Sequence, residues 1–136
     1  VDVYGGGYNL EGALKVLSGE IKQNSMVLIV SDFIGLQKNW KNYLSLVGSN
    51  AHIVAVMIRD PIDYSLEKLK GDFVLKDLNS EEKLAIDSKA KKSYEVSSKK
   101  KVLAIEQEFR LANAFFFPLR TDTDFLDSFI NFGGRI

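Results

Sequence analysis

Three short stretches of the chain are apolar at almost every position, without alternating polar residues. They lie at 26–31, 51–58 and 114–118. Continuous apolar runs of this length are typical of strands that are buried on both faces of a parallel sheet. We therefore predict three buried strands, and we expect Met26 to Val30 to be covered on both faces.

Apolar residues at helical spacing precede and separate these strands. Leu10, Leu14 and Leu17 predict a helix that begins at Leu10, with Asn9 as its N-cap. The other predicted helical segments are 36–46, 62–70, 88–113 and a last helix opened by Thr121, with Asp124 as an acidic variant of the capping box.

Two short strand candidates, 73–76 and 83–86, flank a polar segment and predict an antiparallel hairpin. Helices that alternate with buried strands predict a Rossmann-like α/β fold with a mostly parallel sheet. The length of 136 residues suggests a single domain over 1–136, into which the hairpin is inserted.

The composition argues against several classes of function. Eighteen basic and eighteen acidic side chains cancel, so the overall charge does not favour nucleic acid as a partner. The chain has no cysteine, which excludes zinc–thiolate sites and fits a cytoplasmic location. The single His52 argues against a Ser-His-Asp triad. No apolar run approaches the roughly 20 residues that span a bilayer, so we expect no membrane contact from this segment.

The glycines from Gly5 to Gly12 suggest a phosphate-binding loop, but the pattern is incomplete. Leu10 stands where the dinucleotide fingerprint needs its last glycine, and Ala13 stands where the Walker motif needs lysine. We interpret the segment as a glycine turn before a capped helix. A small-ligand or nucleotide-binding domain that uses this turn and Asp32 is the alternative function.

The first apolar run ends abruptly on Ser31 and Asp32. Open α/β sheets bind ligands at the carboxyl ends of their strands, which makes Asp32 the first functional candidate. It is interpreted as a metal or polar-ligand residue, as a loop or N-cap acid, or as the base of a hydrolase of unknown type. Asp60 and Asp63 flank a proline, and we interpret them as turn-stabilising residues.

Three phrases in this order resemble a known family. They are Gly-Gly-Tyr-Asn-Leu-Glu-Gly-Ala-Leu at 6–14, Leu-Ile-Val-Ser-Asp-Phe at 28–33 and Val-Met-Ile-Arg-Asp-Pro at 56–61. The set resembles the C-terminal part of the von Willebrand factor A-like domain, and more narrowly domain-of-unknown-function family 58. The resemblance implies that 1–136 is the C-terminal fragment of a longer domain and lacks its N-terminal strands.

The resemblance also implies a binding module without catalysis of its own. Such domains often hold a divalent cation with three loops; Asp32 matches the third loop, Tyr8 stands in the threonine position of the second, and the first loop is not in this chain. A weakly bound Mg²⁺ or Mn²⁺ at an incomplete site is therefore expected. Genes of the family commonly lie beside MoxR-type AAA+ ATPases, which implies a partner role in assembling or remodelling complexes.

Two contact surfaces are predicted. The first is the set of residues near the carboxyl ends of the strands, namely Gly7, Tyr8, Asn9, Asp32, Phe33 and Asp60. Phe33 has an alternative role, in which it packs under the following helix. The second is the strand at 26–31, which carries no lysine or proline to protect a sheet edge and is expected to pair with a second copy in a homodimer. In the competing arrangement, Val1 to Tyr4 folds back as a substitute strand.

Overall fold

The computed structural model describes residues 8–64, 74–76, 83–85, 88–124, 126–128 and 130. The helices and strands follow one another as α1 (Leu10–Glu20), β1 (Ser25–Ser31), α2 (Trp40–Gly48), β2 (Ala51–Arg59), α3 (Pro61–Tyr64), β3 (Val74–Lys76), β4 (Lys83–Ala85), α4 (Ser88–Leu111) and β5 (Phe115–Arg120). The entry segment at 1–7, including the proposed substitute strand, lies outside the described residues.

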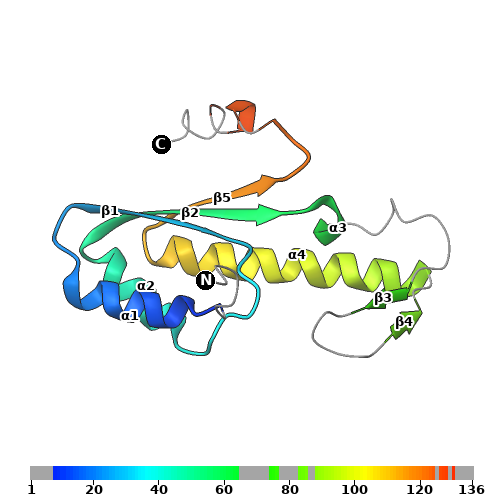
Figure 1. Ribbon diagram of the computed structural model, residues 1–136, viewed down its shortest axis with the longest axis horizontal. Helices are drawn as coiled ribbons and strands as arrows, with labels where there is room; N and C mark the ends of the chain where they lie inside the picture. The colour runs from blue at the N-terminus through cyan, green and yellow to red at the C-terminus, as the bar shows by residue number, and fades with distance from the viewer. Residues whose placement is uncertain are drawn as a thin grey trace, which may run out of the picture.

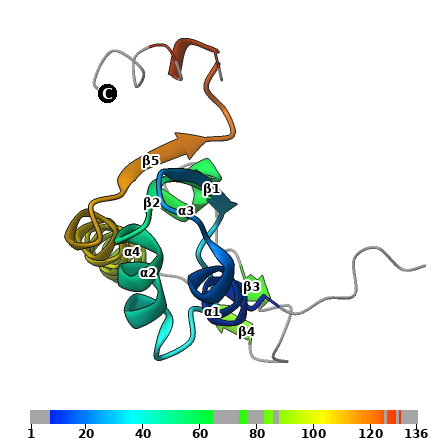
Figure 2. The ribbon, with the colours of Figure 1, turned by 90° about the vertical axis from the view of Figure 1, so that its left-hand side faces the viewer.

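The three predicted strands form one parallel sheet in the order β1-β2-β5. Ser25 pairs with Ala51 at the amino end, and Val54 pairs with Phe115. Helices α1, α2 and α4 all lie on one side of this sheet, while the helical turn at 126–128 lies on the other (Figures 1 and 2). The parallel sheet flanked by helices confirms the Rossmann-like α/β fold. Strands β3 and β4 pair antiparallel, which confirms the predicted hairpin.

The core lies between the sheet and the three helices. Leu14 of α1, Leu44 of α2, Ile53 of β2 and Phe109 of α4 are almost fully buried there. The Phe109 ring lies 5.6 Å from the Trp40 ring, which joins α4 to the first turn of α2. Among the described residues, no helix is both long enough and apolar enough to cross a membrane.

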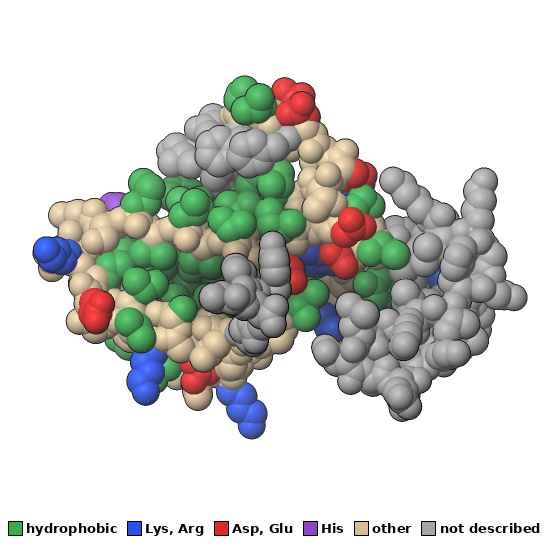
Figure 3. Space-filling model, viewed as in Figure 1, with side chains coloured by type: hydrophobic (Ala, Val, Ile, Leu, Met, Phe, Trp, Pro, Cys, Tyr) green, Lys and Arg blue, Asp and Glu red, His purple; other side chains and the backbone are tan. Residues whose placement is uncertain are grey.

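The prediction that β1 is buried on both faces is wrong. Met26, Leu28 and Val30 are 77%, 63% and 58% exposed, whereas Ile29 on the opposite face is 9% exposed. Strand β1 is an edge strand, and the described helices cover only one of its faces. Apolar side chains are consequently gathered on the surface along this edge of the molecule (Figure 3).

Two predicted helix starts are also corrected. Helix α2 begins at Trp40 rather than at residue 36, because the preceding loop is held by the Gln37 side chain, which donates to the carbonyl of Tyr8 at 2.9 Å. Asp124, not Thr121, caps the last helical turn, since its Oδ1 accepts from the backbone N–H of Leu126 at 2.8 Å. The start of α1 is confirmed: Asn9 Oδ1 accepts from the N–H of Gly12 at 2.8 Å.

Candidate functional site

The loop that follows β1 is held in a defined conformation by its own side chains. Ser31 Oγ accepts from the backbone N–H of Phe33 at 2.9 Å, and Asp32 Oδ1 accepts from that of Ile34 at 3.0 Å. Phe33 has φ of 55° and Gly35 has φ of 77°. The left-handed region is unfavourable for a bulky residue by about 1–2 kcal/mol, so the surrounding contacts must fix this turn.

Phe33 supplies those contacts from inside the protein. It is 4% exposed, and its ring lies 5.2 Å from the Phe109 ring of α4 and 6.1 Å from the Phe116 ring of β5. The ring therefore anchors the loop in the core, where it packs on rings of α4 and β5, and gives no exposed contact area. The next residue, Ile34, is 67% exposed at the tip of the loop.

Tyr8 joins Ser31 and Asp32 at the carboxyl end of β1. Burial raises the pKa of Tyr8, a hydrogen bond with the Ser31 side chain lowers it, and the Asp32 charge raises it, with a net upward shift. The phenol is therefore protonated at neutral pH while 37% of the residue is exposed. Of the other predicted contact residues, Asn9 serves as the cap of α1, and Gly7 lies outside the described residues.

These side chains do not make a complete site for a divalent cation. Ser31 Oγ and Asp32 Oδ1 already accept backbone hydrogen bonds. Within the ranges that the structure describes, no group of three or more His, Cys, Asp or Glu side chains converges on a point. Mg²⁺ and Ca²⁺ need about six oxygen ligands, which this group of residues does not offer on its own.

Asp60 follows β2 as Asp32 follows β1, but it is used within the turn. Its Oδ1 accepts from the N–H of Ile62 at 3.1 Å, and its Oδ2 accepts from Thr121 Oγ1 at 3.1 Å. The Asp60 N–H in turn donates to Asp63 Oδ2 at 2.9 Å. The turn-stabilising interpretation of Asp60 and Asp63 is thereby confirmed.

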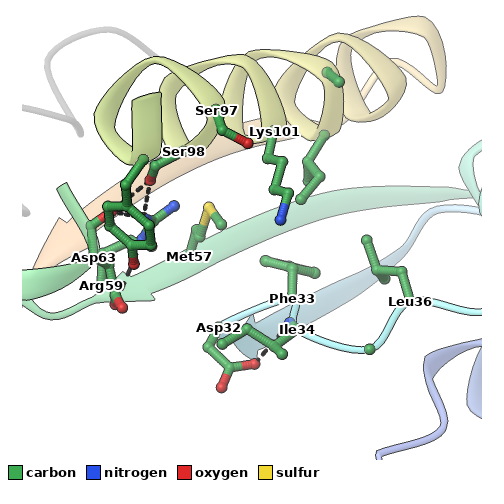
Figure 4. A pocket seen from close by; sticks show the side chains of 14 residues that line it. Asp32, Phe33, Ile34, Leu36, Met57, Arg59, Asp63, Ser97, Ser98 and Lys101 are labelled. Carbon is green, nitrogen blue, oxygen red and sulfur yellow. Dashed lines mark hydrogen bonds and ion pairs between the residues drawn. The ribbon is translucent and has the colours of Figure 1, made fainter. Parts of the chain in front are cut away.

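A cavity of about 600 Å³ opens between the loop after β1, the end of β2 and one side of α4 (Figure 4). Arg59 is buried at one end of it, at 8% exposure. Its Nη2 donates to Ser98 Oγ at 2.7 Å and to the carbonyl of Asp63, and its Nε lies 3.6 Å from Asp63 Oδ2. The Ser98 hydroxyl donates to the same Asp63 carbonyl. This network ties α3 to α4 beside the cavity.

Tyr94 and Lys101 of α4 line the same cavity. Burial raises the pKa of Tyr94, and the Asp63 carboxylate raises it further against a smaller opposite effect of Arg59. The Tyr94 hydroxyl is therefore a neutral donor. The sequence did not single out Arg59, Ser98 or Lys101 as site residues. One signal in the sequence could have indicated this site: Arg59 ends an apolar strand. A buried arginine is expected to pair with a carboxylate, and such a pair marks a polar group beside the core.

The described residues of the cavity do not form a nucleophile–base pair. The Ser98 hydroxyl is engaged with Asp63 and Arg59, and no histidine or cysteine is among the lining residues described. His52 pairs with Met26 near the amino ends of the strands, at the end of the sheet opposite to the cavity. Within the cavity, Tyr94 offers a hydrogen-bond donor and Lys101 a positive charge.

Comparison with curated proteins and with solved structures finds no match to the chain. A family model described as "Protein of unknown function DUF58" matches residues 4–103. The match includes the loop after β1, the turn after β2 and most of α4, and it covers more than half of the 136 residues. The chain therefore belongs to the DUF58 family.

Proposed function

We propose that the chain is a non-catalytic protein-interaction module that contacts its partner through the loop after β1. The contact surface consists of Tyr8, Asp32 and Ile34, and is called the β1-loop surface below. The observation that supports it is the fixed conformation of this loop: Phe33 anchors it from the core, and Ser31 and Asp32 bond its backbone. A surface that is already ordered loses less conformational entropy on binding.

The chemistry of the β1-loop surface fits a protein partner. It combines a half-exposed aromatic ring, an apolar side chain at 67% exposure and one carboxylate. Aromatic and apolar side chains beside polar groups are typical of interface centres. Asp60 is left out of this surface, because both of its carboxylate oxygens accept hydrogen bonds within the chain.

The nucleotide-binding alternative is less well supported. A phosphate loop needs free backbone N–H groups at the start of a helix. The Gly12 N–H is already bonded to Asn9 Oδ1, and the Glu11 N–H donates to Gln37 Oε1 at 3.2 Å. The described start of α1 is thus capped by the protein's own side chains.

The partner that we propose is a MoxR-type AAA+ ATPase, and the process is assembly or remodelling of a complex. The support is the family to which the chain belongs together with the gene association that its resemblance implies. An ATPase partner would supply the chemistry that the described cavity lacks, while this chain would supply recognition.

Capture of a purified MoxR-type ATPase by the immobilised chain tests the proposal. Ile34→Asp, Tyr8→Ala and Asp32→Ala should each reduce capture while the melting temperature stays near that of the parent. Leu46→Asp is the matched control, because Leu46 is 53% exposed on α2, away from the loop. Equal capture by all of these proteins would reject the β1-loop surface.

Self-association through β1 is a second part of the proposal. Among the described residues β1 pairs only with β2, so the backbone groups of its other edge face outward, beside Met26, Leu28 and Val30. An edge strand without lysine or proline is a template for pairing, and a two-fold axis lets the same strand pair with itself antiparallel.

Sedimentation velocity at micromolar concentration tests this pairing. The parent should sediment as a dimer, and Leu28→Lys should give a monomer, because lysine on an edge strand opposes pairing. Val16→Lys on α1 is the control, since Val16 is 61% exposed and lies on a helix. A monomeric parent would contradict self-association, without bearing on the β1-loop surface.

A further inference from the structure

The cavity beside the β1-loop surface has the size and lining of a small-molecule site. Its volume of about 600 Å³ lies in the range of ligand pockets, roughly 300–1,000 Å³. Phe33 and Met57, at 4% and 3% exposure, form its apolar floor, and Ile105 of α4 adds to the wall. An apolar group of ligand size can therefore be removed from water here.

Two acidic and two basic residues line the cavity, and only Arg59 and Asp63 of these four are paired with each other in the part of the chain that the structure describes. Arg59 is compensated by the Asp63 carboxylate, whose Oδ2 lies 3.6 Å from its Nε. Lys101 makes no hydrogen bond or ion pair with the protein in the part of the chain that the structure describes. Figure 4 shows its amino group extending from α4 toward Phe33, over the apolar floor, while the Asp32 carboxylate is turned outward below Ile34.

We propose that this cavity binds a small carboxylic acid with a bulky apolar body. The body lies on Phe33 and Met57, and the carboxylate is bound by the Lys101 ammonium. A charge-assisted hydrogen bond is stronger than one between neutral groups. Asp32 and Ile34 of the β1-loop surface also line this cavity, so the site adjoins that surface. The proposed partner contact does not depend on a bound acid.

The two methionines of the chain give a direct reporter and an internal control. Met57 lies in the cavity floor, whereas Met26 is 77% exposed on the outward face of β1. The experiment labels both methyl groups with ¹³C and records their NMR signals during titration with N-acetyl-L-phenylalanine. The same titration with N-acetyl-L-phenylalaninamide supplies a neutral probe of nearly equal shape.

The acid should shift the Met57 signal in a saturable manner and leave the Met26 signal in place. Lys101→Met should weaken binding of the acid about 10-fold, as expected for the loss of one hydrogen bond to a charged group, and should not change binding of the amide. Lys100→Met is the matched control, because Lys100 directly precedes Lys101 on α4 and does not line the cavity. Ala104→Phe should abolish binding of both probes by filling the space.

A third probe, N-acetyl-Ala-Ala-Phe, distinguishes a free acid from the carboxyl terminus of a peptide. Tighter binding of the peptide assigns the site to a chain terminus, and tighter binding of the single residue assigns it to a free acid; either result supports a carboxylate site. The proposal is overturned if acid and amide bind equally to the parent and to Lys101→Met. It is also overturned if neither probe moves Met57, or if both methionine signals move together.

Discussion

Two aspartates follow neighbouring parallel strands of the same sheet, and the protein uses them differently. Asp60, after β2, has both carboxylate oxygens hydrogen bonded, to Ile62 and to Thr121. Asp32, after β1, accepts a hydrogen bond from the backbone N–H of Ile34 with one carboxylate oxygen, and both aspartates are exposed. The turn after β2 therefore joins α3 to β5, whereas the loop after β1 presents side chains to the outside.

The difference lies in what holds each connection. The turn after β2 is held by polar bonds around the buried Arg59, whose Nη2 donates to Ser98 Oγ and to the carbonyl of Asp63. The loop after β1 is anchored by the buried ring of Phe33, whose backbone has a positive φ, and the neighbouring Ile34 is exposed. Position at the carboxyl end of a strand is therefore not enough to identify a contact residue.

The largest effect is expected at the anchor of the β1 loop. Phe33→Ala should lower the free energy of unfolding by about 3–4 kcal/mol, because it leaves a cavity against Phe109 and Phe116. Phe33→Gly should be more stable than Phe33→Ala by about 1 kcal/mol, since glycine tolerates φ of 55°. Urea denaturation measures both values. A glycine variant less stable than the alanine variant would show that the backbone is not strained there.

The second-largest loss of stability is expected in the polar turn after β2. Asp63→Ala should lower the free energy of unfolding by about 2 kcal/mol, because it leaves the buried Arg59 guanidinium without its carboxylate. Glu106→Ala is the control: it removes an exposed i,i+4 pair with Arg110 and should cost only about 0.5 kcal/mol. Equal losses in urea denaturation would mean that the Arg59 network does not stabilise this end of the sheet.

Replacing either of the two aspartates should lower the stability less than these changes, and Asp60 should matter more than Asp32. Asp60→Ala should cost about 1 kcal/mol, since two accepted hydrogen bonds are lost, and Asp32→Ala about half of that. The reverse order would mean that the loop after β1 depends on its carboxylate more than on Phe33. Thermal melts of the two variants beside the parent provide the comparison.

The smallest effect is expected from metal ions. Isothermal titration with Mg²⁺ and Mn²⁺ should reveal no binding tighter than about millimolar, as expected for sites with few charged ligands. Micromolar binding that disappears in Asp32→Ala would instead assign a real cation site to the loop after β1.

Much of the fold could be predicted from the pattern of apolar residues. The three strands, the hairpin and the N-capped start of α1 all depend on local sequence, and the structure has them close to the predicted ranges. The burial of β1 could not be predicted in this way. A run of Met, Val, Leu and Ile has the same sequence in a central strand and at an edge, and only the sheet order distinguishes them.

The candidate site was predicted only in part. Asp32 was identified from its place after a strand, and its proximity to Tyr8 and Ser31 is found in the structure. The cavity could not be predicted, because Arg59 of β2 is far in the sequence from Ser98 and Lys101 of α4, and they meet only when α4 packs beside β2. The start of α2 was misplaced for a similar reason, since contacts of Gln37 and Asn39 with residues near α1 hold the preceding loop.

The central claim is that the loop after β1 binds a partner while the turn after β2 supports the fold. Its most direct test is the dissociation constant of a purified MoxR-type ATPase for the parent, Ile34→Asp, Asp32→Ala and Asp60→Ala. Ile34→Asp and Asp32→Ala should weaken binding about 10-fold or more, and Asp60→Ala should bind like the parent below its melting temperature. Unchanged binding by Ile34→Asp and Asp32→Ala, or loss of binding in Asp60→Ala alone, would contradict it.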